Sequence, residues 1–588
     1  MRTAIQAFAL TMFVSSLPSV ASAITVTLEP ESPPPAAVGD VVSWDAATSD
    51  AGSSPVEYRF RVRAAGAAFR VIRDFSPSSR FSWTATEHDG SYQIQVTVKN
   101  PDSGETASAT STYEFTSRVI GGAPVISGTA NPLVALYSAP PCPAGSRMRV
   151  EFQAPGGVAQ DTDYRACADG LSMNFYLGGM RSNTAYTVHQ TVLTGTATAN
   201  GPSLTWTTPV VSPAIASYSV LQQPQTNLPY GVLLQSTLQQ MTVATDLQGN
   251  LIWYYPGNIT SLTRPESGGL FLGIAENQGA KTSDQVLREF DLAGNTTMET
   301  NAARINEQLA AMGRRQITSF HHEARRLPSG RIMTLAASEQ VLINVQGPGA
   351  VDVIGDMILV LDRDMQVVWV WDSFDNLSLR RFATLGDTCQ QATGGCPPFT
   401  LMAKANDWLH GNSLQLTPDG NILYSSRSQD WLIKIEYGNG NGTGRVMWRL
   451  GKDGDFQMNS DDPNPWFSHQ HDPSLYSDSL LSVFDDGNTR QASDPSAHSR
   501  GQVLKLDEIN MQASLVVNAD LGAYSYALGS AQRLPNGDYH FDLGWVRGDG
   551  LGDRSQSIEV DKTGKIVYNI QAMTPEYRTF RMRDLYTP

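Results

Sequence analysis

A short motif recurs six times after residue 230, and this recurrence constrains the fold more than any other feature of the chain. Each copy has an Asp- or Asn-containing turn followed by a strand-like run, which in several copies ends on an aromatic residue. The copies are 246–253, 291–295, 362–369, 437–448, 507–511 and 561–568. Their irregular spacing, roughly 45–80 residues, is compatible with propeller blades that carry loop insertions.

A second unit, consisting of a strand, a tight turn and another strand, alternates with the first. Its turns are 328–330, 418–420, 477–479 and 535–537, and all but the third contain the Gly that favours a hairpin. Two alternating hairpin units make a four-stranded blade, and six blades close into a ring without long exposed edges. The sequence therefore predicts a six-bladed β-propeller over 230–588, with a large β-sandwich array as the alternative.

The N-terminal part also has an all-β pattern. Residues 56–62 and 91–98 alternate between apolar and polar side chains, as half-buried strands do. Runs at this spacing predict an immunoglobulin-like β-sandwich over 24–118. The run 173–177 marks a second small, fibronectin-like β unit over 119–215. Neither unit has clustered reactive residues, so we expect them to be structural or docking domains.

The first 23 residues have the layout of a secretory signal peptide. Arg2 gives a basic start, an apolar run follows, and Ala21-Ser22-Ala23 has the small-residue pattern of a cleavage site. The apolar run is shorter than the about 20 residues that span a bilayer. We therefore expect a signal peptide over 1–23, no membrane span, and a periplasmic or secreted protein.

The four cysteines predict disulfide bonds, because an even number of cysteines in an exported chain is typical of them. Four cysteines allow three pairings. Proximity favours Cys142 with Cys167 and Cys389 with Cys396, and one pair that stays reduced is the alternative.

The formal net charge of −15 argues against general nucleic-acid binding, which needs a basic surface. An acidic protein that handles an anionic substrate must concentrate its positive groups locally. The places where histidine and arginine occur together are therefore the candidate sites.

Five of the nine histidines lie in three short segments, each just before one of the hairpin turns. His322, Asn412 and His471 each stand seven residues before the middle of the turn that follows. Equivalent positions on the first strands of several blades would point at one spot. The strand that returns after the turn at 418–420 brings Arg427 to the same end.

Strand alternation predicts which of these side chains share a face. Residues i and i+2 lie on the same face of a strand. The side chains of His469 and His471 therefore share a face, and so do those of residues 410 and 412. His322 matches their phase, whereas His321 points away unless the strand is bulged.

These segments resemble the bacterial arylsulfotransferases. The resemblance covers about 230–588 and rests on residues 321–323, 407–413, 425–427, 470–472 and 485–490. It implies a six-bladed propeller that works outside the cytoplasm and needs no nucleotide sulfate donor. Such an enzyme moves sulfate from an aryl sulfate ester to a phenol through a sulfated histidine. Family members commonly form dimers, so a homodimer is a possible assembly.

Carried onto this sequence, the resemblance assigns the nucleophile to His471, with His469 as the alternative. A neutral imidazole is nucleophilic near pH 7 because its unperturbed pKa is about 6.5. Attack on the ester would release a phenolate and leave a sulfuryl group on nitrogen. A phenol acceptor would then reverse the step, which gives ping-pong kinetics.

The resemblance also assigns the residues around the sulfate. Arg427, Asn412 and His410 would hold the non-reacting oxygens where charge develops. One histidine of the pair His321 and His322 is a further active-site residue, and the register favours His322. This histidine would protonate the leaving phenolate and later deprotonate the acceptor.

Two other functions fit parts of the pattern. His322, His410 and His471 together are the ligand types of a three-histidine zinc site, which would indicate a metal-dependent hydrolase. No HExxH motif or Asp-rich ligand spacing supports that reading. A non-catalytic exported propeller that binds carbohydrate or protein is the other alternative. The favoured interpretation needs no cofactor, and its partners are a small aryl sulfate donor and a phenol acceptor.

Overall fold

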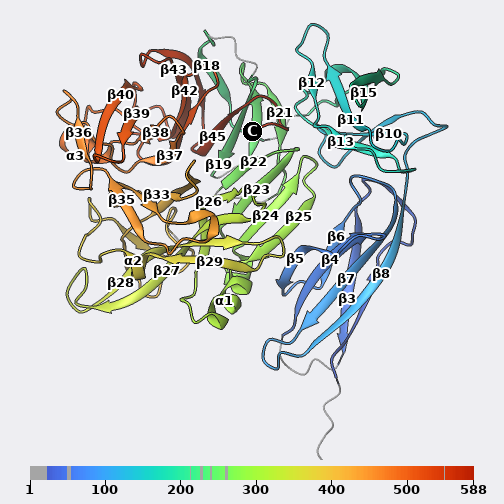
Figure 1. Ribbon diagram of the computed structural model, residues 1–588, viewed down its shortest axis with the longest axis horizontal. Coiled ribbons are helices and arrows are strands. Elements are labelled where there is room, and N and C mark those ends of the chain that lie inside the picture. The colour runs from blue at the N-terminus through green and yellow to red at the C-terminus, as the bar shows by residue number, and fades with distance from the viewer. Residues whose placement is uncertain are drawn as a thin grey trace, which may run out of the picture.

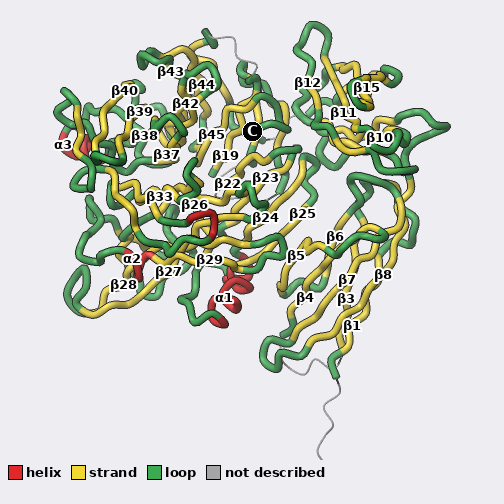
Figure 2. Tube along the Cα trace, viewed as in Figure 1, coloured by secondary structure: helices red, strands yellow, loops and turns green. Residues whose placement is uncertain are grey.

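We describe the protein from a computed structural model. The structure describes residues 23–49, 55–211, 214–225, 230–238, 241–257, 262–277, 279–391, 393–548 and 550–588. All of the expected signal peptide except Ala23 lies outside these ranges. The regular structure is almost entirely β-strand, which confirms the all-β prediction (Figures 1 and 2). The α-helices in the described ranges are α1 (Ala302–Ala311), α2 (Ser373–Asn376) and α3 (Asn488–Ser493). None of the helices described here is long and apolar enough to cross a membrane.

The first eight strands form two sheets that pack face to face as a β-sandwich. One sheet contains β1 (Thr25–Pro30), β3 (Val42–Ser49) and β6 (Arg80–Trp83). The other contains β2 (Ala36–Ala37), β8 (Thr106–Thr116), β7 (Gly90–Lys99), β4 (Glu57–Ala64) and β5 (Arg70–Ser76). The shared core is aromatic, with Phe60 stacked on Phe81 at 4.7 Å between ring centroids. Alternating apolar residues of β4 and β7 face this core.

A second small β unit follows. Its first sheet contains β9 (Val125–Gly128), β10 (Ala135–Ala139) and β14 (Met173–Leu177). Its second sheet contains β11 (Arg147–Gln153), β12 (Gln160–Asp161), β13 (Arg165–Ala166), β15 (Ala185–Thr194), β16 (Ala197–Asn200) and β17 (Leu204–Thr207). The predicted Cys142–Cys167 disulfide is present here, with a Cα–Cα distance of 5.6 Å.

The remaining chain builds six four-stranded antiparallel arrays. The first three contain β19 (Val232–Thr237), β20 (Val243–Asp246) and β21 (Leu251–Tyr254) with the C-terminal strand β45 (Glu576–Met582); β22 (Leu262–Glu266), β23 (Leu270–Ala275), β24 (Val286–Asp291) and β25 (Thr296–Asn301); and β26 (Ser319–Arg326), β27 (Ile332–Ile343), β28 (Ala350–Leu361) and β29 (Val367–Asp372). The other three contain β32 (Gly411–Leu416), β33 (Ile422–Ser426), β34 (Trp431–Ile435) and β35 (Val446–Leu450); β37 (His471–Leu475), β38 (Leu480–Asp485), β39 (Arg500–Asp507) and β40 (Gln512–Asp520); and β41 (Gly529–Arg533), β42 (Tyr539–Val546), β43 (Arg554–Val560) and β44 (Ile566–Ala572).

Four further strands extend these arrays. β30 (Thr388–Gln390) and β31 (Lys404–Asp407) join the sheet of β28, and β36 (Gln457–Asn459) pairs with β40. β18 (Tyr218–Gln222) pairs with β44, so the chain enters the arrays before the expected start at 230.

Both repeated sequence units have a fixed place in the arrays. We number the strands of each array along the chain, except that β45 counts as the first strand of the array that it forms with β19, β20 and β21. All six copies of the first unit then join the third strand of an array to its fourth, and the hairpin turns join the first strand to the second. The aspartates explain the first unit. Asp246 Oδ1 accepts hydrogen bonds from the backbone N–H groups of Gln248 at 2.9 Å and Asn250 at 3.0 Å. Asp561 makes the same pair of bonds in the last copy, so each carboxylate closes a tight turn.

The first strands of the six arrays contact one another in order: β22, β26, β32, β37, β41 and β45. β45 also contacts β22, so the series returns to its beginning. Because β45 is the last strand of the chain and pairs with β19, strands from the two ends of this region complete one array. This arrangement brings the N-terminal ends of several first strands to one place.

The sandwich is attached to the arrays at one corner (Figure 1). β5 pairs in parallel with β25 through Arg73 and Glu299. Asn301 then connects the two parts, because its Oδ1 accepts a bond from the Arg304 N–H at the start of α1 and its Nδ2 donates to the Phe75 carbonyl at 2.8 Å. The second β unit shares an apolar core with the arrays of β19–β21 and β22–β25.

The Asn301→Ala variant should lose about 2 kcal/mol of unfolding free energy. It removes a helix cap and leaves a buried carbonyl without its donor. Asn301→Ser keeps an acceptor for the cap but not the donor, so its loss should be smaller. Denaturant unfolding of the two variants measures both effects, and equal stabilities for the alanine variant and the parent would contradict this role.

Candidate active site

The three histidine segments lie at the N-terminal ends of β26, β32 and β37, on arrays that are neighbours. Each of these first strands carries an irregularity at that end. The pairing register with the second strand shifts between His321 and Ala324, between residues 411 and 413, and between residues 471 and 474. His322, His410 and His469 have left-handed backbone, with φ of 58°, 48° and 53°. Such backbone is costly for these residues and persists only where the surroundings impose it.

The bulge in β26 determines the direction in which the side chain of His321 points. Strict alternation would turn it away from His322, but the two Nδ1 atoms lie only 2.9 Å apart. Burial opposes protonation of His321, but the contact of its Nε2 with Asp356 Oδ1 at 3.1 Å outweighs burial and raises its pKa. Burial, aided by the charge of His410, lowers the pKa of His322 well below its usual value. Both histidines therefore face the cluster, and a proton shared between them rests on His321.

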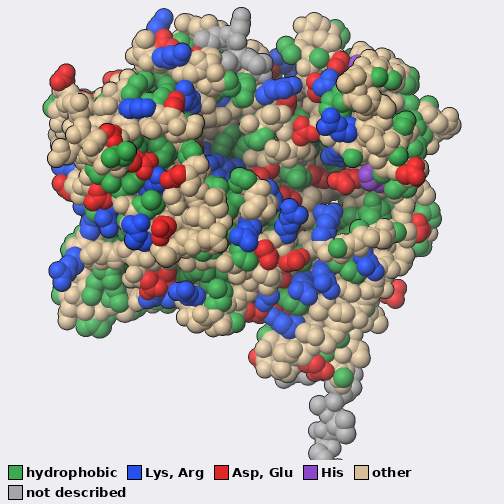
Figure 3. Space-filling view, viewed as in Figure 1, with side chains coloured by type: hydrophobic (Ala, Val, Ile, Leu, Met, Phe, Trp, Pro, Cys, Tyr) green, Lys and Arg blue, Asp and Glu red, His purple; other side chains and the backbone are tan. Residues whose placement is uncertain are grey.

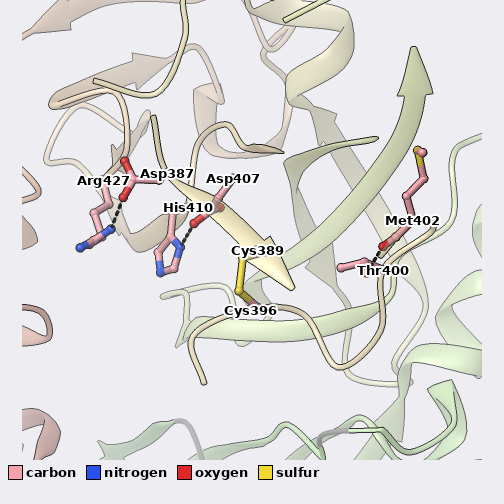
Figure 4. The surroundings of a disulfide bond; sticks show 8 residues. All are labelled: Asp387, Cys389, Cys396, Thr400, Met402, Asp407, His410 and Arg427. Carbon is pink, nitrogen blue, oxygen red and sulfur yellow. Dashed lines mark hydrogen bonds and ion pairs between the residues drawn. A yellow bond between two sulfur atoms is a disulfide. The ribbon is translucent and has the colours of Figure 1, made fainter. Parts of the chain in front are cut away.

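His410 directly precedes β32 and Arg427 directly follows β33, and the two residues lie side by side (Figure 4). The His410 Nδ1 contacts Asp407 Oδ2 at 2.5 Å, and its ring lies 4.9 Å from that of His322 between centroids. Arg427 Nη1 lies 3.6 Å from Asp387 Oδ1. The Arg427 backbone N–H also donates to the His410 carbonyl. The cation predicted near the histidines is thus in place.

The segment that carries Asp387 covers this side of the cluster. It is closed by the second predicted disulfide, Cys389–Cys396, with a Cα–Cα distance of 5.4 Å (Figure 4). Burial would raise the pKa of Asp387, but its contacts with His469 and Arg427 lower it to about 2. A carboxylate therefore stays charged between the two cationic side chains.

His469 is held by carboxylates on both ring nitrogens. Its Nδ1 lies 2.9 Å from Asp430 Oδ1, and its Nε2 lies 3.4 Å from Asp387 Oδ2. Burial and the charge of Arg427 oppose protonation, but the two aspartates outweigh them and raise the pKa of His469. An imidazole that keeps its second proton has no lone pair to offer, so these contacts disfavour His469 as a nucleophile.

His471 has the opposite surroundings. Its Nδ1 lies 2.7 Å from Asp486 Oδ2, whereas its Nε2 has no hydrogen-bond or ion-pair partner in the described part of the chain. Burial, followed by the positive charges of Arg427 and His410, lowers the pKa of His471 well below its usual value. Burial raises the pKa of Asp486. His471 is therefore neutral, and the form with ionised Asp486 carries a free lone pair on Nε2.

Asn412 lies in the bulge of β32, and its Nδ2 donates to the Gln470 carbonyl at 2.8 Å. Its Oδ1 is buried without a hydrogen-bond partner among the described residues. Asn412 therefore joins the strands that carry His410 and His471. All six predicted site residues, and His469, come together in one buried cluster.

Sequence reasoning missed the groups that support this cluster from the last strand, β45. The Tyr577 hydroxyl lies 2.9 Å from the His322 carbonyl and 3.1 Å from the Asn412 carbonyl. Arg578 donates to the Asn412 carbonyl at 3.0 Å and to Glu323 at 2.8 Å. The signal that could have revealed them is the charge of β45, which carries charged side chains at 576, 578 and 581 although it is a buried strand.

The sequence analysis also missed the carboxylate partners, namely Asp356, Asp387, Asp407, Asp430 and Asp486. Beside the histidines there is a cavity of only about 20 Å³, room for about one water, whose walls include residues 395–397 and Glu276. Desolvation raises the pKa of Glu276 to about 7. No three His, Cys, Asp or Glu side chains in the described ranges are grouped so that they could hold a metal ion.

Fold and site together define an all-β protein with a buried cluster of histidines, cations and carboxylates where its first strands meet. The sequence profile of the arylsulfotransferase (ASST) family matches residues 195–580, more than half of the chain. The chain belongs to the arylsulfotransferase family, which confirms the resemblance seen in the sequence, and membership supports aryl sulfotransferase activity in general.

No curated protein matches the chain. The solved structures that it matches include the FN1–FN3 domains of chicken CNTN1, at 10% identity over 30% of this chain and 64% of that chain, with a TM-score of 0.13. They also include the chicken interferon gamma receptor alpha chain, at 9% identity over 32% and 100% of the two chains, with a TM-score of 0.14. A two-domain fibronectin type III segment of chicken tenascin matches at 17% identity over 31% and 96%, also with a TM-score of 0.14. Similarity at these scores carries no weight for the fold or function of this chain.

The raised pKa of His469 predicts a pH-dependent contribution to stability. A group whose pKa is raised by folding stabilises fully below its unfolded pKa of about 6.5, and this contribution is lost as the pH rises through the folded pKa. The Tm of the parent minus that of His469→Gln should therefore fall as the pH is raised from about 6. Histidines that do not interact with His469 contribute equally to both proteins and cancel in this difference. Two parallel Tm curves would contradict the assignment.

Proposed function

We propose that this protein is an exported sulfotransferase that moves a sulfuryl group from an aryl sulfate ester to a phenol through His471. The observation that supports the proposal is the His471–Asp486 pair, in which the form with ionised Asp486 has a free lone pair on Nε2 of a neutral imidazole. The positive charge of Arg427 helps to lower the pKa of this imidazole. The six four-stranded arrays would be the blades of a β-propeller, preceded by two sandwich domains. Two disulfides fit a protein that works outside the cytoplasm, and a homodimer is the assembly that the family suggests.

In the first step, the Nε2 lone pair of His471 attacks the sulfur of the donor. The N–S bond forms, the S–O bond to the aryl group breaks, and the electron pair leaves with the phenolate. The imidazole ring becomes cationic, and ionised Asp486 balances that charge at Nδ1. In the second step, the oxygen of a phenol acceptor attacks the same sulfur and the N–S bond breaks.

Arg427, His410 and Asn412 would hold the three non-reacting oxygens. Arg427 already lies near the carboxylate of Asp387, so the sulfate of the donor has to compete with that carboxylate. The cavity beside the histidines holds about one water, and the segment with the Cys389–Cys396 disulfide would therefore move when an aryl sulfate enters.

The proton chemistry belongs to the pair His321 and His322. His322 is neutral, so it accepts the proton of the phenol acceptor as a general base. The proton for the leaving phenolate comes through His322 from His321, because the two Nδ1 atoms are 2.9 Å apart and His321 has the raised pKa.

Intact mass measured after mixing the protein with nitrophenyl sulfate, without acceptor, tests the nucleophile. We expect a gain of one sulfuryl group in the parent and none in His471→Asn. His469→Asn is the matched control two residues away and should still gain the group. A gain that persists in His471→Asn but vanishes in His469→Asn would move the nucleophile, and no gain with no nitrophenol release would reject the function.

Asp486→Asn should slow sulfuryl uptake by about a hundredfold or more, because the amide can still accept the Nδ1 proton but cannot balance the charge of the sulfated ring. In the parent, uptake should accelerate as the pH rises and the pair loses its second proton. That acceleration should be weaker in the variant. Single-turnover release of nitrophenolate across pH measures both, and an unchanged rate and profile would exclude this role of Asp486.

A further inference from the structure

Residues 393–403, which we call the covering segment, form one side of the histidine cluster. The wall of the small cavity beside the histidines includes residues 395–397. A Cβ atom added at Gly395 would lie 3.9 Å from Cε1 of His410, so the segment rests against the cluster. The cavity has room for about one water, and a larger ligand therefore needs part of this wall to move. The contacts that hold the covering segment down control access to the histidines.

The far end of the covering segment is bound by two carboxyl groups of the long β27–β28 hairpin. The Leu401 backbone N–H donates to Glu339 Oε2 at 2.8 Å. The Met402 backbone N–H donates to Asp352 Oδ2 at 2.9 Å. Val341 pairs directly with Asp352, so Glu339, two residues before it on β27, lies on the same face of the sheet. One carboxyl from each strand thus binds one of two successive amides.

Apolar packing contributes little at this end of the segment. The side chains of Leu401 and Met402 are 62% and 39% exposed. Hydrophobic side chains are also visible on the surface over the β27–β28 hairpin (Figure 3), where Ile343 is 66% exposed. The middle of the segment has its own anchor, because the Gly279 N–H donates to the carbonyl of buried Pro398 at 3.2 Å. The position of residues 401 and 402 therefore depends on the two carboxyl groups.

The same two carboxyl groups also interact with each other. Glu339 Oε1 and Asp352 Oδ1 are buried, and neither has a hydrogen-bond partner in the described structure. The two side chains lie within reach of a direct hydrogen bond. Two ionised carboxylates would repel each other here, whereas a single shared proton satisfies both remaining oxygens. Burial, together with the charge of Asp352, raises the pKa of Glu339 to about 7.

No Lys, Arg or His side chain in the described ranges forms an ion pair with either carboxyl, and the covering segment contains no charged residue. Asp356 and Asp407, on the adjoining strands, are bound to histidines of the cluster. Burial also raises the pKa of Glu276 to about 7, so a test has to change Glu339 itself. The other charged residues on the neighbouring elements are Lys281, Asp284, Arg314, Arg315 and Lys404.

We propose that Glu339 and Asp352 form a latch that closes the covering segment when they share a proton and loosens it when both are ionised. In the closed form, each carboxyl accepts one backbone N–H, and the proton joins the two remaining oxygens. When that proton is released to water, two negative charges lie side by side and weaken both anchor points. The latch regulates access to the site of the proposed function, and only this consequence rests on sulfuryl transfer.

Opening of the latch should become easier as the pH rises from about 4.3 to about 7. In the open form, Glu339 regains the ordinary pKa of a glutamate, about 4.3. In the closed form its pKa is raised to about 7, so between these values the closed form binds a proton that the open form has released. The opening constant should therefore rise by up to about tenfold per pH unit in this range and level off above it.

Hydrogen exchange of the backbone amides at 401 and 402, measured from pH 5 to pH 8 without substrate, tests the latch in the full chain. Glu339→Gln copies the protonated pair, because its amide donates to Asp352 and its carbonyl still accepts the Leu401 N–H. The intrinsic effect of pH cancels in the ratio of parent to variant exchange rates. We expect this ratio to rise by about tenfold or more between pH 5 and pH 7. Glu339→Ala should exchange rapidly at every pH.

Asp352→Asn makes the same neutral pair and gives a second test should the first variant fail to fold. Asp364→Asn is the matched control, because Asp364 is exposed beyond the opposite end of β28 and its loss should leave the pH dependence of the parent intact. A ratio that stays constant with pH in both neutral variants, or equal protection in Glu339→Ala and the parent at pH 5, would overturn the latch. A protein that shows this pH dependence but takes up no sulfuryl group would keep the latch and lose only the proposed function.

Discussion

The ion pair between Glu323 and Arg578 is the interaction on which the arrangement of the first strands depends. Both side chains are fully buried and their atoms lie 2.8 Å apart, on β26 and on the closing strand β45. Arg578 also reaches the Asn412 carbonyl on β32 and Asp472 on β37. Removing one partner of such a buried pair costs about 3–5 kcal/mol, because the other charge is left alone. One arginine thus holds together the strands that carry the histidines.

The contacts of Arg578 with these strands stabilise the irregular backbone of the site. His322 and His410 have left-handed φ values that the chain would not adopt on its own. The Tyr577 hydroxyl meets the carbonyls of His322 and Asn412, the residues at two of the bulges. A regular strand would send alternate side chains to opposite faces, and the bulges instead direct successive histidines into one cluster.

Electrostatics gives neighbouring histidines opposite preferences for a second proton, although they lie in the same short segment of the sequence. His469 and His471 are two residues apart, yet carboxylates on both nitrogens favour the proton on the first, and burial beside Arg427 disfavours it on the second. The protein has a net charge of −15, so attraction of the anionic donor that we propose would have to come from a local excess of positive charge. In the structure, the carboxylate of Asp387 lies between Arg427 and His469 and contacts both side chains.

The sequence by itself determined the all-β class, the six turns that contain Asp or Asn and the family, and it favoured the two disulfide pairings, because each depends on local turn chemistry, short spacings or a linear motif. Counting from hairpin turns also predicted that His322, Asn412 and His471 lie at one end of the arrays. Strand alternation added His410, and the returning strand added Arg427. Only the tertiary structure decided which histidine is neutral, that His321 faces the cluster, and that Tyr577 and Arg578 support it. Those outcomes depend on bulges and on carboxylates from segments as distant as 323 and 578 in the chain, and a local pattern does not specify which distant charges will meet.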